Sequence, residues 1–339
     1  MKFKLGIVCL FAALIAFSVV ASDRLIVASW NVENLFDTED DPLNEGDNGY
    51  TPRGWMRWTN ARYALKLRHL ADVIVRMRPD ILGLMEVENR RVLEDLVRTL
   101  KEKHGYEMPH IMHRDGDEKR GIEVAILSKH AAVATNWIQS VTGQREVLVC
   151  EFVINGRSLT LLANHWKSQL GKKAESDDIR RLEALGVRSY LDKRLASDPA
   201  AALIVAGDFN DSPSSPILVE AAGFALDKRR VLNDSSGRLL YNLTGTLPEG
   251  KHGTYYYAPK KQWSFLDAII VSRGMLAEAE PGAPWKVVQG SYEIFKTDEQ
   301  CDKEGRPLPF RRVRSKSVGD VYFTGYSDHF PVRVTLKAR

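Results

Sequence analysis

The chain is poor in cysteine. Its 339 residues contain three cysteines, of which only Cys150 and Cys301 lie beyond the first apolar segment. An oxidising compartment permits a disulfide between these two residues, but spacing alone does not show that they meet. Cys150 also sits in a strand-like run, where a buried free thiol is an equally good interpretation. Both alternatives stay open at the level of sequence.

The chain also lacks a large excess of positive or negative charge. There are 48 lysines and arginines against 44 aspartates and glutamates, which gives a net charge of +4. The first apolar segment and its flank contribute two lysines and no acid, so the remaining chain carries 4 − 2 = +2. A balance this close to zero neither demands nor excludes a nucleic-acid substrate.

Only one long apolar run is present, at Leu5–Val20, and no other stretch could cross a membrane. Two lysines precede it and the small residues of Val20–Ser22 follow it, as in a signal peptide over 1–22. The alternative is an uncleaved anchor, but the run is short for a span of about 20 residues. Cys9 lacks the small residues that precede a lipid-attachment site. We therefore predict a secreted or periplasmic monomer, folded as one domain over 23–339 and not stably bound to a membrane.

Helix and strand patterns alternate along this domain, without internal repeats or low-complexity linkers. Thr59 is a predicted helix N-cap and Pro79 ends that helix, while Gly105 ends the next. Asn155-Gly156 is a strong hairpin signal, and a third helix is expected over about 175–195. Strands are expected at Met108–His113, Ile122–Ser128, Glu146–Ile154, Ser158–Ala163, Phe265–Ser272 and Pro331–Leu336. The alternation indicates an α/β protein with mixed sheets covered by helices.

Two segments have the composition of surface insertions. Asp37–Trp58 is acidic at first and then aromatic and rich in Gly and Pro, and Gly282–Gly325 is loop-like and contains Arg311, Arg312, Arg314 and Lys316. We expect both at the surface, where either could shape a substrate groove.

The most informative pattern is a polar group at the end of each of several apolar runs. A strand that is apolar until its last residue has left the core and reached a cleft. Carboxylates, amides and two histidines collect in this way, without a cysteine or serine nucleophile among them, and such hard oxygen ligands suit Mg²⁺ or Ca²⁺. The residues are Asn31, Glu33, Glu86, Glu88, Asn164, His165, Asp208, Asn210, Asp328 and His329.

Six motifs carry these residues in a fixed order, and together they resemble the endonuclease/exonuclease/phosphatase superfamily, the group of deoxyribonuclease I and exonuclease III. The motifs span nearly the whole domain and look most like the secreted bacterial nuclease branch. The resemblance implies a four-layer αββα sandwich with its site at one rim. The motifs are Ser29–Asn34, Leu84–Asn89, Asn164–Ser168, Gly207–Asn210, Phe265–Asp267 and Tyr326–Pro331.

The resemblance assigns a role to each residue. Glu86 would be the main ligand of Mg²⁺, with Ca²⁺ or Mn²⁺ as alternatives, because a carboxylate can hold the ion while water and a phosphate oxygen complete its shell. The competing interpretation of Glu86 is a solvated acid at a strand end. Asn31 would orient the metal or a phosphate oxygen, and Asp328 would support the metal or the attacking water.

Proton transfer and water alignment fall to the remaining groups. Asp208 and Asn210 would align or deprotonate the attacking water, although they could also form an Asx turn. His165 and His329 are the candidates for proton transfer, because a carboxylate partner can raise a histidine pKa. Asp267 is the expected partner of His329, and Glu123 is the expected partner of His165. Which histidine is the acid and which is the base stays open.

Arg120 and Lys167 are expected to hold substrate phosphates, and the arginine cluster at 311–316 is either a phosphate site or a solvated face. The run Tyr255–Tyr257 could stack on bases, but packing is the favoured interpretation.

The predicted function is a metal-dependent phosphodiesterase, in which an activated water attacks phosphorus in line. A nuclease acting on DNA or RNA is favoured. Inositol polyphosphate phosphatases are disfavoured by the sequence Trp263–Ala268, which lacks their usual motif. A sphingomyelinase-like enzyme, or one acting on a small phosphoester, is an alternative. A non-catalytic module on the same fold is a weaker one, because Glu86 and the Asp-His pair are present.

Overall fold

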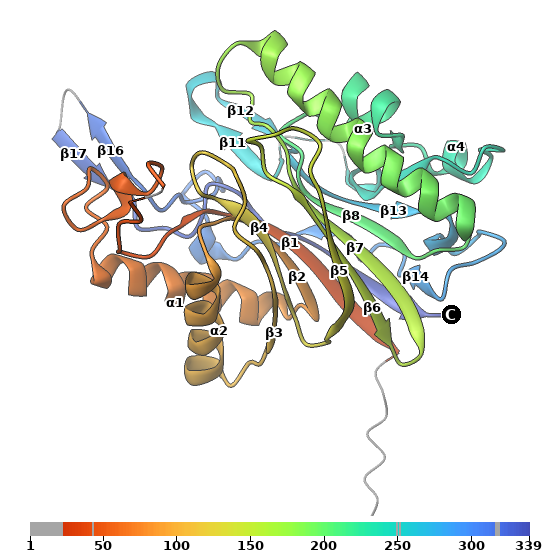
Figure 1. Ribbon diagram of the computed structural model, residues 1–339, viewed down its shortest axis with the longest axis horizontal. Coiled ribbons are helices and arrows are strands. Elements are labelled where there is room, and N and C mark those ends of the chain that lie inside the picture. Colours follow the sequence, from red (N-terminus) through yellow and green to blue (C-terminus); the bar gives the residue numbers. More distant parts are fainter. Residues whose placement is uncertain (1–22, 43, 249, 251, 316–318) are drawn as a thin grey trace, which may run out of the picture.

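The computed structural model describes residues 23–339 apart from 43, 249, 251 and 316–318. The predicted signal peptide, 1–22, and Lys316 lie outside the described residues. Two large sheets stack face to face, with helices on the outer face of each (Figure 1). Among the described residues, no helix combines the length and apolar character that a membrane span needs.

The first sheet has the strand order β14-β18-β1-β2-β4-β3, with β15 also paired to β18. β1 runs parallel to β2 and antiparallel to β18. Its strands are β1 (Arg24–Leu35), β2 (Ile81–Val87), β3 (His110–Met112), β4 (Glu123–Ser128), β14 (Trp285–Val287), β15 (Glu293–Ile294) and β18 (Val332–Ala338).

The second sheet has the order β5-β6-β7-β8-β13-β10-β9. β6 and β7 form the predicted hairpin, in which Asn155 and Gly156 both have positive φ, of 52° and 75°, as a tight turn of this kind requires. The strands are β5 (Ala132–Ile138), β6 (Val147–Ile154), β7 (Arg157–His165), β8 (Leu203–Asp208), β9 (Phe224–Ala225), β10 (Leu240–Asn242) and β13 (Asp267–Ser272).

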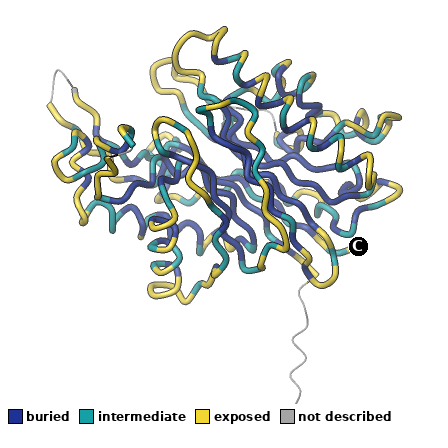
Figure 2. Tube along the Cα trace, viewed as in Figure 1, coloured by how far each residue is buried: buried dark blue, intermediate teal, exposed yellow. Residues whose placement is uncertain are grey.

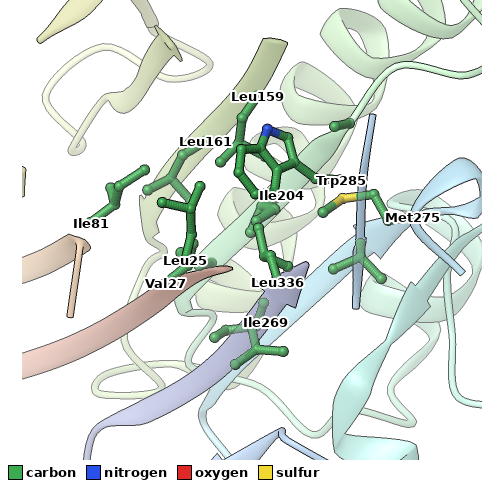
Figure 3. Packing of buried hydrophobic residues seen from close by; sticks show 14 of the residues in the cluster. Leu25, Val27, Ile81, Leu159, Leu161, Ile204, Ile269, Met275, Trp285 and Leu336 are labelled. Carbon is green, nitrogen blue, oxygen red and sulfur yellow. The ribbon is translucent and has the colours of Figure 1, made fainter. Parts of the chain in front are cut away.

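A dry core lies between the two sheets, because alternate apolar residues of each strand point inward. Leu25 and Val27 of β1 face Leu161 of β7 and Ile204 of β8 in one buried cluster (Figure 3). The central strands of both sheets are buried along most of their length, whereas the edge strand β5 is mostly exposed (Figure 2). Burial on both faces is what turns these strands into nearly continuous apolar runs.

Helices cover both outer faces. On the first sheet, α1 (Asn60–Met77) and α2 (Arg90–His104) begin at the N-caps Thr59 and Asn89. Gly105, at φ 61°, ends α2 as predicted. On the second sheet lie α3 (Lys173–Ser197), α4 (Lys228–Leu232) and a π-helical turn, η2 (Ile217–Ala221). The predicted four-layer αββα sandwich is confirmed.

The sequence pattern did not predict β5 and several shorter strands. β5 was not predicted, and the segment 282–325 contains two edge strands, β14 and β15, and a hairpin of β16 (Arg312–Ser315) and β17 (Gly319–Tyr322). A second small hairpin joins β11 (Tyr255–Tyr257) to β12 (Gln262–Ser264). Strands of two to four residues are too short to show an alternation, and their partners alone define them. The seven residues of β5 are mostly exposed and have no buried face.

Candidate active site

The second sheet brings three of the predicted residues into one row. β8 lies between β7 and β13, and its last residue, Asp208, is in register with His165 on one side and Asp267 on the other. A Cβ on Gly207, at φ 148°, would lie 1.9 Å from the carbonyl oxygen of Asn164. Only glycine therefore allows β7 and β8 to approach this closely before Asp208.

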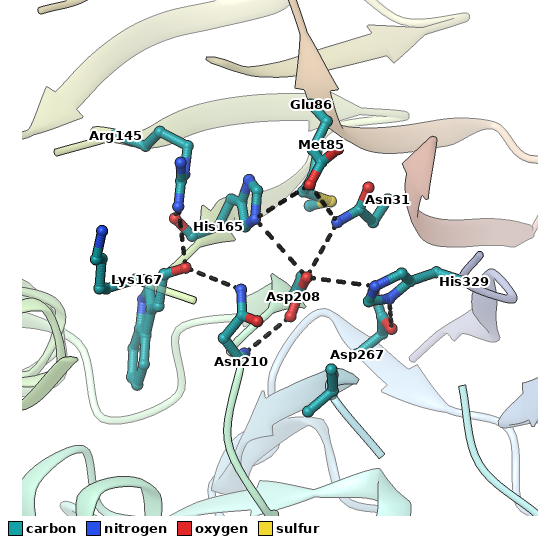
Figure 4. A network of polar contacts seen from close by, with 12 residues as sticks. Asn31, Met85, Glu86, Arg145, His165, Lys167, Asp208, Asn210, Asp267 and His329 are labelled. Atoms are coloured by element: carbon teal, nitrogen blue, oxygen red, sulfur yellow. Dashed lines mark hydrogen bonds and ion pairs between the residues drawn. The ribbon is translucent and has the colours of Figure 1, made fainter. Parts of the chain in front are cut away.

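The first sheet brings Asn31 and Glu86 to the same rim, because β1 and β2 are parallel and end together. Asn31 joins the two sheets: its Nδ2 donates to Asp208 Oδ2 at 3.0 Å and to Glu86 Oε1 at 3.3 Å (Figure 4). His165 Nε2 lies 3.7 Å from Asp208 Oδ2 and 3.9 Å from Glu86 Oε1. Four of the predicted residues thus converge on one point.

The backbone at this point is strained. Glu33, Asn34, Glu86 and Asn210 have φ values of 54°, 60°, 65° and 50°, in the left-handed region that non-glycine residues rarely adopt. The register between β1 and β2 shifts in the same place. At this irregularity the Glu86 carboxylate lies against β1 and accepts the backbone N–H of Asn34 at 3.0 Å. Strain of this kind clusters at functional sites.

His329 is held beside Asp208 by its own set of contacts. Its Nδ1 hydrogen-bonds Asp267 Oδ2 at 2.7 Å, which confirms the predicted pair, and its Nε2 lies 3.9 Å from Asp208 Oδ2. Ser327 Oγ accepts the His329 backbone N–H at 3.1 Å and donates to the Asn31 carbonyl at 2.7 Å. The Tyr255 ring lies 4.8 Å from the imidazole ring.

The two histidines are shifted in opposite directions. Burial alone would lower the pKa of His329, but the charges of Asp267 and Asp208, together with the hydrogen bond to Asp267, raise this pKa well above 6.5. Burial lowers the pKa of His165 well below 6.5, and the charges of Arg145 and Arg120 lower it further. At neutral pH, His329 is therefore an imidazolium and His165 is a neutral ring.

Asp208 is fully enclosed between these groups. Burial raises its pKa to about 7, and the positive charge of His329 opposes the rise. Its other oxygen, Oδ1, accepts the backbone N–H of Asn210 at 2.8 Å, so the predicted Asx turn is present. The Asn210 Nδ2 donates to the Trp166 carbonyl at 3.0 Å, which fixes the amide next to Asp208.

The donors fit a hard divalent cation. Glu86 Oε1 and Asp208 Oδ2 both face the Asn31 amide, and no lysine or arginine is hydrogen-bonded or ion-paired to either carboxylate among the described residues. A second set, Asp208, Asp267 and His329, brings three donor atoms within 4.8 Å of one another. In that set Asp267 Oδ2 is already hydrogen-bonded to His329 Nδ1 at 2.7 Å, a contact that would be lost if either atom bound an ion. Glu86 and Asp208 are therefore the better candidate ligands. Asn31 presents its Nδ2 donor to both carboxylates, and its Oδ1 accepts the backbone N–H of Glu33 at 3.0 Å, so it orients the ligands rather than binding the ion.

Asp328 is engaged elsewhere. Its Oδ2 lies 3.0 Å from Arg311 Nη1, and the same nitrogen lies 3.4 Å from Glu33 Oε1. Lys66 is fully buried next to this group, and its Nζ donates to the Tyr326 carbonyl at 2.6 Å. Burial raises the pKa of Glu33 and lowers the pKa of Lys66. Sequence reasoning missed Lys66, because a lysine in an amphipathic helix reads as a solvated residue.

Glu123 does not pair with His165 as predicted. Among the residues that the structure describes, the buried His165 Nδ1 has no hydrogen-bond partner. Burial and the charge of Glu118 raise the pKa of Glu123 to about 8. Arg145, which sequence reasoning also missed, lies between these groups and donates to the carbonyls of His165 and Trp166 at 3.0 and 3.2 Å. Its only sequence signal is a charged residue at the start of an apolar strand.

The two predicted phosphate-binding residues lie at the rim. Arg120 is exposed and donates to the side chain of Asn34, next to Glu86. Lys167 directly follows Trp166, and its side chain lies at the edge of the network in Figure 4. Of the two cations, Arg120 lies close enough to the site for its charge to lower the pKa of His165.

The chain belongs to the endonuclease/exonuclease/phosphatase family, whose model matches residues 26–338. Members of this family hydrolyse phosphoesters and depend on divalent metals. A search of curated proteins finds no sequence match.

Solved structures confirm the fold at low identity. TDP2 from D. rerio, complexed with a single-strand DNA product, is 16% identical with a TM-score of 0.53, over 93% of this chain and 99% of that chain. The mannosyl-6-phosphatase Bt3783 of Bacteroides thetaiotaomicron is 19% identical with a TM-score of 0.53, over 92% and 99%. SmcL is 17% identical with a TM-score of 0.54, over 93% and 99%.

Proposed function

We propose that this protein is a secreted, Mg²⁺-dependent phosphodiesterase whose substrate is a nucleic acid. One observation carries the proposal: Asp208 Oδ2 lies 3.9 Å from His329 Nε2 and 3.7 Å from His165 Nε2, and the Glu86 carboxylate faces the same point. Titratable groups whose environments push their pKa values apart are a mark of acid-base chemistry. The similarity of the fold to that of TDP2, which is solved with a DNA product, supports a nucleic-acid substrate.

Each side chain has a part in an in-line displacement. Glu86 and Asp208 would hold the cation, with Asn31 orienting both carboxylates, and the cation would neutralise charge on the phosphoryl oxygens. Asp208, whose Oδ2 faces both histidines, would also orient the attacking water and accept its proton. His329 carries the proton that the leaving oxygen needs, and Asp267 keeps it charged. His165 donates a hydrogen bond to a non-bridging oxygen.

A phosphomonoester substrate is the second candidate, because a mannosyl-6-phosphatase shares the fold. The lipid alternative has weaker support. Of the aromatic run that could enter a bilayer, Tyr255 packs on His329 and Tyr256 packs on Trp263, and only Tyr257 is exposed. This run by itself is therefore a poor membrane anchor.

The deciding experiment is cleavage of supercoiled plasmid and of single-stranded RNA by the protein in Mg²⁺, in Ca²⁺ and in EDTA. We expect metal-dependent cleavage that falls about 10²–10⁴-fold in Asp208→Ala, the range for loss of a general base. Asp178→Ala, which removes an exposed acid on α3, is the matched control and should keep full activity. Hydrolysis of sugar phosphates with both nucleic acids left intact would replace the proposal by the phosphomonoester candidate.

A further inference from the structure

The two insertions predicted from the sequence pack against each other beside the active site. Trp58 from the first and Phe310 from the second share a small buried cluster, with ring centroids 5.5 Å apart. The backbone N–H of Phe310 donates to Glu33 Oε2 at 2.5 Å, two residues from Asn31. The insertions thus form one structural unit that is attached to the site.

Three exposed aromatic side chains project from this unit: Trp55 is 52% exposed, Tyr322 44% and Phe323 38%. We call Trp55, Tyr322 and Phe323 the aromatic platform. The buried guanidinium of Arg312 lies over the rings of both Trp55 and Tyr322, at 5.7 and 5.6 Å, and donates to the Trp55 carbonyl. The contacts to Arg312 hold two of the rings in place and leave them partly open to solvent.

The surroundings of the platform are cationic. Among the described residues, the segments 51–59 and 310–323 together contain five arginines and a single acid, Asp320. Arg53, Arg57 and Arg314 are exposed. The acids of the first insertion lie in its other half, where Glu39 pairs with Arg91 of α2 at 2.7 Å. Charge is therefore segregated, and the positive half carries the aromatic rings.

The platform is continuous with the catalytic rim. Just beyond the β16–β17 hairpin, the backbone N–H of Phe323 donates to the Arg311 carbonyl at 2.7 Å. Arg311 in turn pairs with Asp328, the neighbour of His329. In Figure 1 the hairpin and the first insertion project together from one end of the sandwich. A chain whose phosphate lies over Asp208 would meet Arg311 first and the platform next.

We propose that the aromatic platform stacks on unpaired bases of a single-stranded nucleic acid, while its arginines contact the flanking phosphates. This inference rests on the proposed function and names its substrate class. Stacking rings beside a cationic track are the combination that binds single strands, whereas the bases of a duplex are already stacked on each other. A bilayer is a poorer fit, because the exposed aliphatic side chain of β16, Val313, is accompanied by three exposed arginines, Arg53, Arg57 and Arg314.

The test compares a long and a minimal substrate. Trp55→Ala keeps the backbone carbonyl that binds Arg312, and it should raise KM for a single-stranded 12-mer roughly five- to hundredfold, the effect of losing one stacked base. Its kcat should change less than twofold, and kcat/KM for bis(p-nitrophenyl) phosphate should not change. Trp55→Phe should restore binding, and Val153→Ala, an exposed apolar truncation on β6, is the matched control.

A second variant tests the charge. Arg314→Gln should reduce the salt dependence of 12-mer binding by about one phosphate contact, measured as the slope of log Kd against log salt. Arg181→Gln, an exposed arginine on α3, should leave that slope unchanged. Equal slopes in the two variants would show that Arg314 does not contact a phosphate of the bound strand.

The outcomes separate the platform from the activity. A wild-type KM for Trp55→Ala on the 12-mer refutes the platform while the nuclease proposal stands. If the wild-type protein cleaves neither substrate, the proposed function fails, and anisotropy with the 12-mer still tests the platform: fivefold weaker binding by Trp55→Ala supports it, and equal binding or none refutes it. Binding to phosphatidylcholine/phosphatidylserine vesicles that is lost in Trp55→Ala would make the surface a membrane site instead.

Discussion

Asp267→Asn isolates the charge that keeps His329 protonated. The substitution keeps the size of the side chain and an oxygen that can accept from His329 Nδ1, now 2.7 Å from Asp267 Oδ2. Both residues are buried, so solvent screens little of the change. A hydrogen bond to a charged group contributes about 1.5–3 kcal/mol, and a neutral one contributes about 0.5–1.5 kcal/mol.

The difference, about 1–2 kcal/mol, corresponds to roughly one unit of the His329 pKa, because one unit is about 1.4 kcal/mol. We therefore expect the basic limb of the pH–rate profile to move down by about one unit. The maximal rate should also fall, by up to about 10²–10⁴-fold if the imidazolium is the acid. The assay is single-turnover cleavage of a labelled oligonucleotide between pH 5 and pH 10.

Stability gives a second readout of the same pair. The folded pKa of His329 is raised, so its stabilising contribution is complete below about 6.5, the unfolded value, and is lost as pH rises through the folded pKa. The loss of unfolding free energy in Asp267→Asn, measured with urea, should therefore be larger at pH 6 than at pH 10. A basic limb that stays in place, together with a pH-independent loss of stability, would refute the role given to Asp267.

Three further predictions follow from the described contacts. Glu86→Gln should weaken Mg²⁺ binding at least about tenfold by calorimetry, and unchanged affinity would place the ion elsewhere. Glu123→Gln should leave the pH–rate profile unchanged, because Glu123 does not contact His165. Since the pKa of Glu123 is raised to about 8, wild-type stability falls as pH rises from about 4.5 through 8, and the variant should gain roughly 1–4 kcal/mol over the wild type between pH 5 and pH 9. The buried Cys150 thiol, with a pKa raised to about 12, should react with a thiol reagent only after unfolding, unlike the half-buried Cys301.

The rim of the site was predictable because it follows from strand order. Asn31, Glu86, His165 and Asp208 each end an apolar run, and parallel strands of one sheet end at one edge. The pairing of Asp267 with His329 came from family resemblance, and the 2.7 Å contact confirms it.

The surroundings of the histidines could not be predicted in the same way. His165 ends a strand of the second sheet, whereas Glu123 begins a strand of the first, and a linear motif carries no information on contacts between sheets. Arg145 precedes β6 and donates to the backbone carbonyl of His165, which is an acceptor that any residue type offers. Lys66 lies on α1, one layer away from the catalytic residues in the fold. Contacts of these kinds depend on packing between layers rather than on local pattern.

The cross-sheet position of Asn31 links catalysis to the thickness of the core. Asn31 and Glu86 belong to one sheet, and Asp208 and His165 belong to the other, so the site is spanned by hydrogen bonds of 3.0 and 3.3 Å from a single amide. Any change that spreads the sheets by a fraction of an ångström, such as an enlarged side chain at Ile204 or Leu161, would lengthen these bonds before it unfolds the chain. We therefore expect activity to be lost at temperatures below the unfolding transition, because the spacing of the two sheets determines the lengths of these hydrogen bonds.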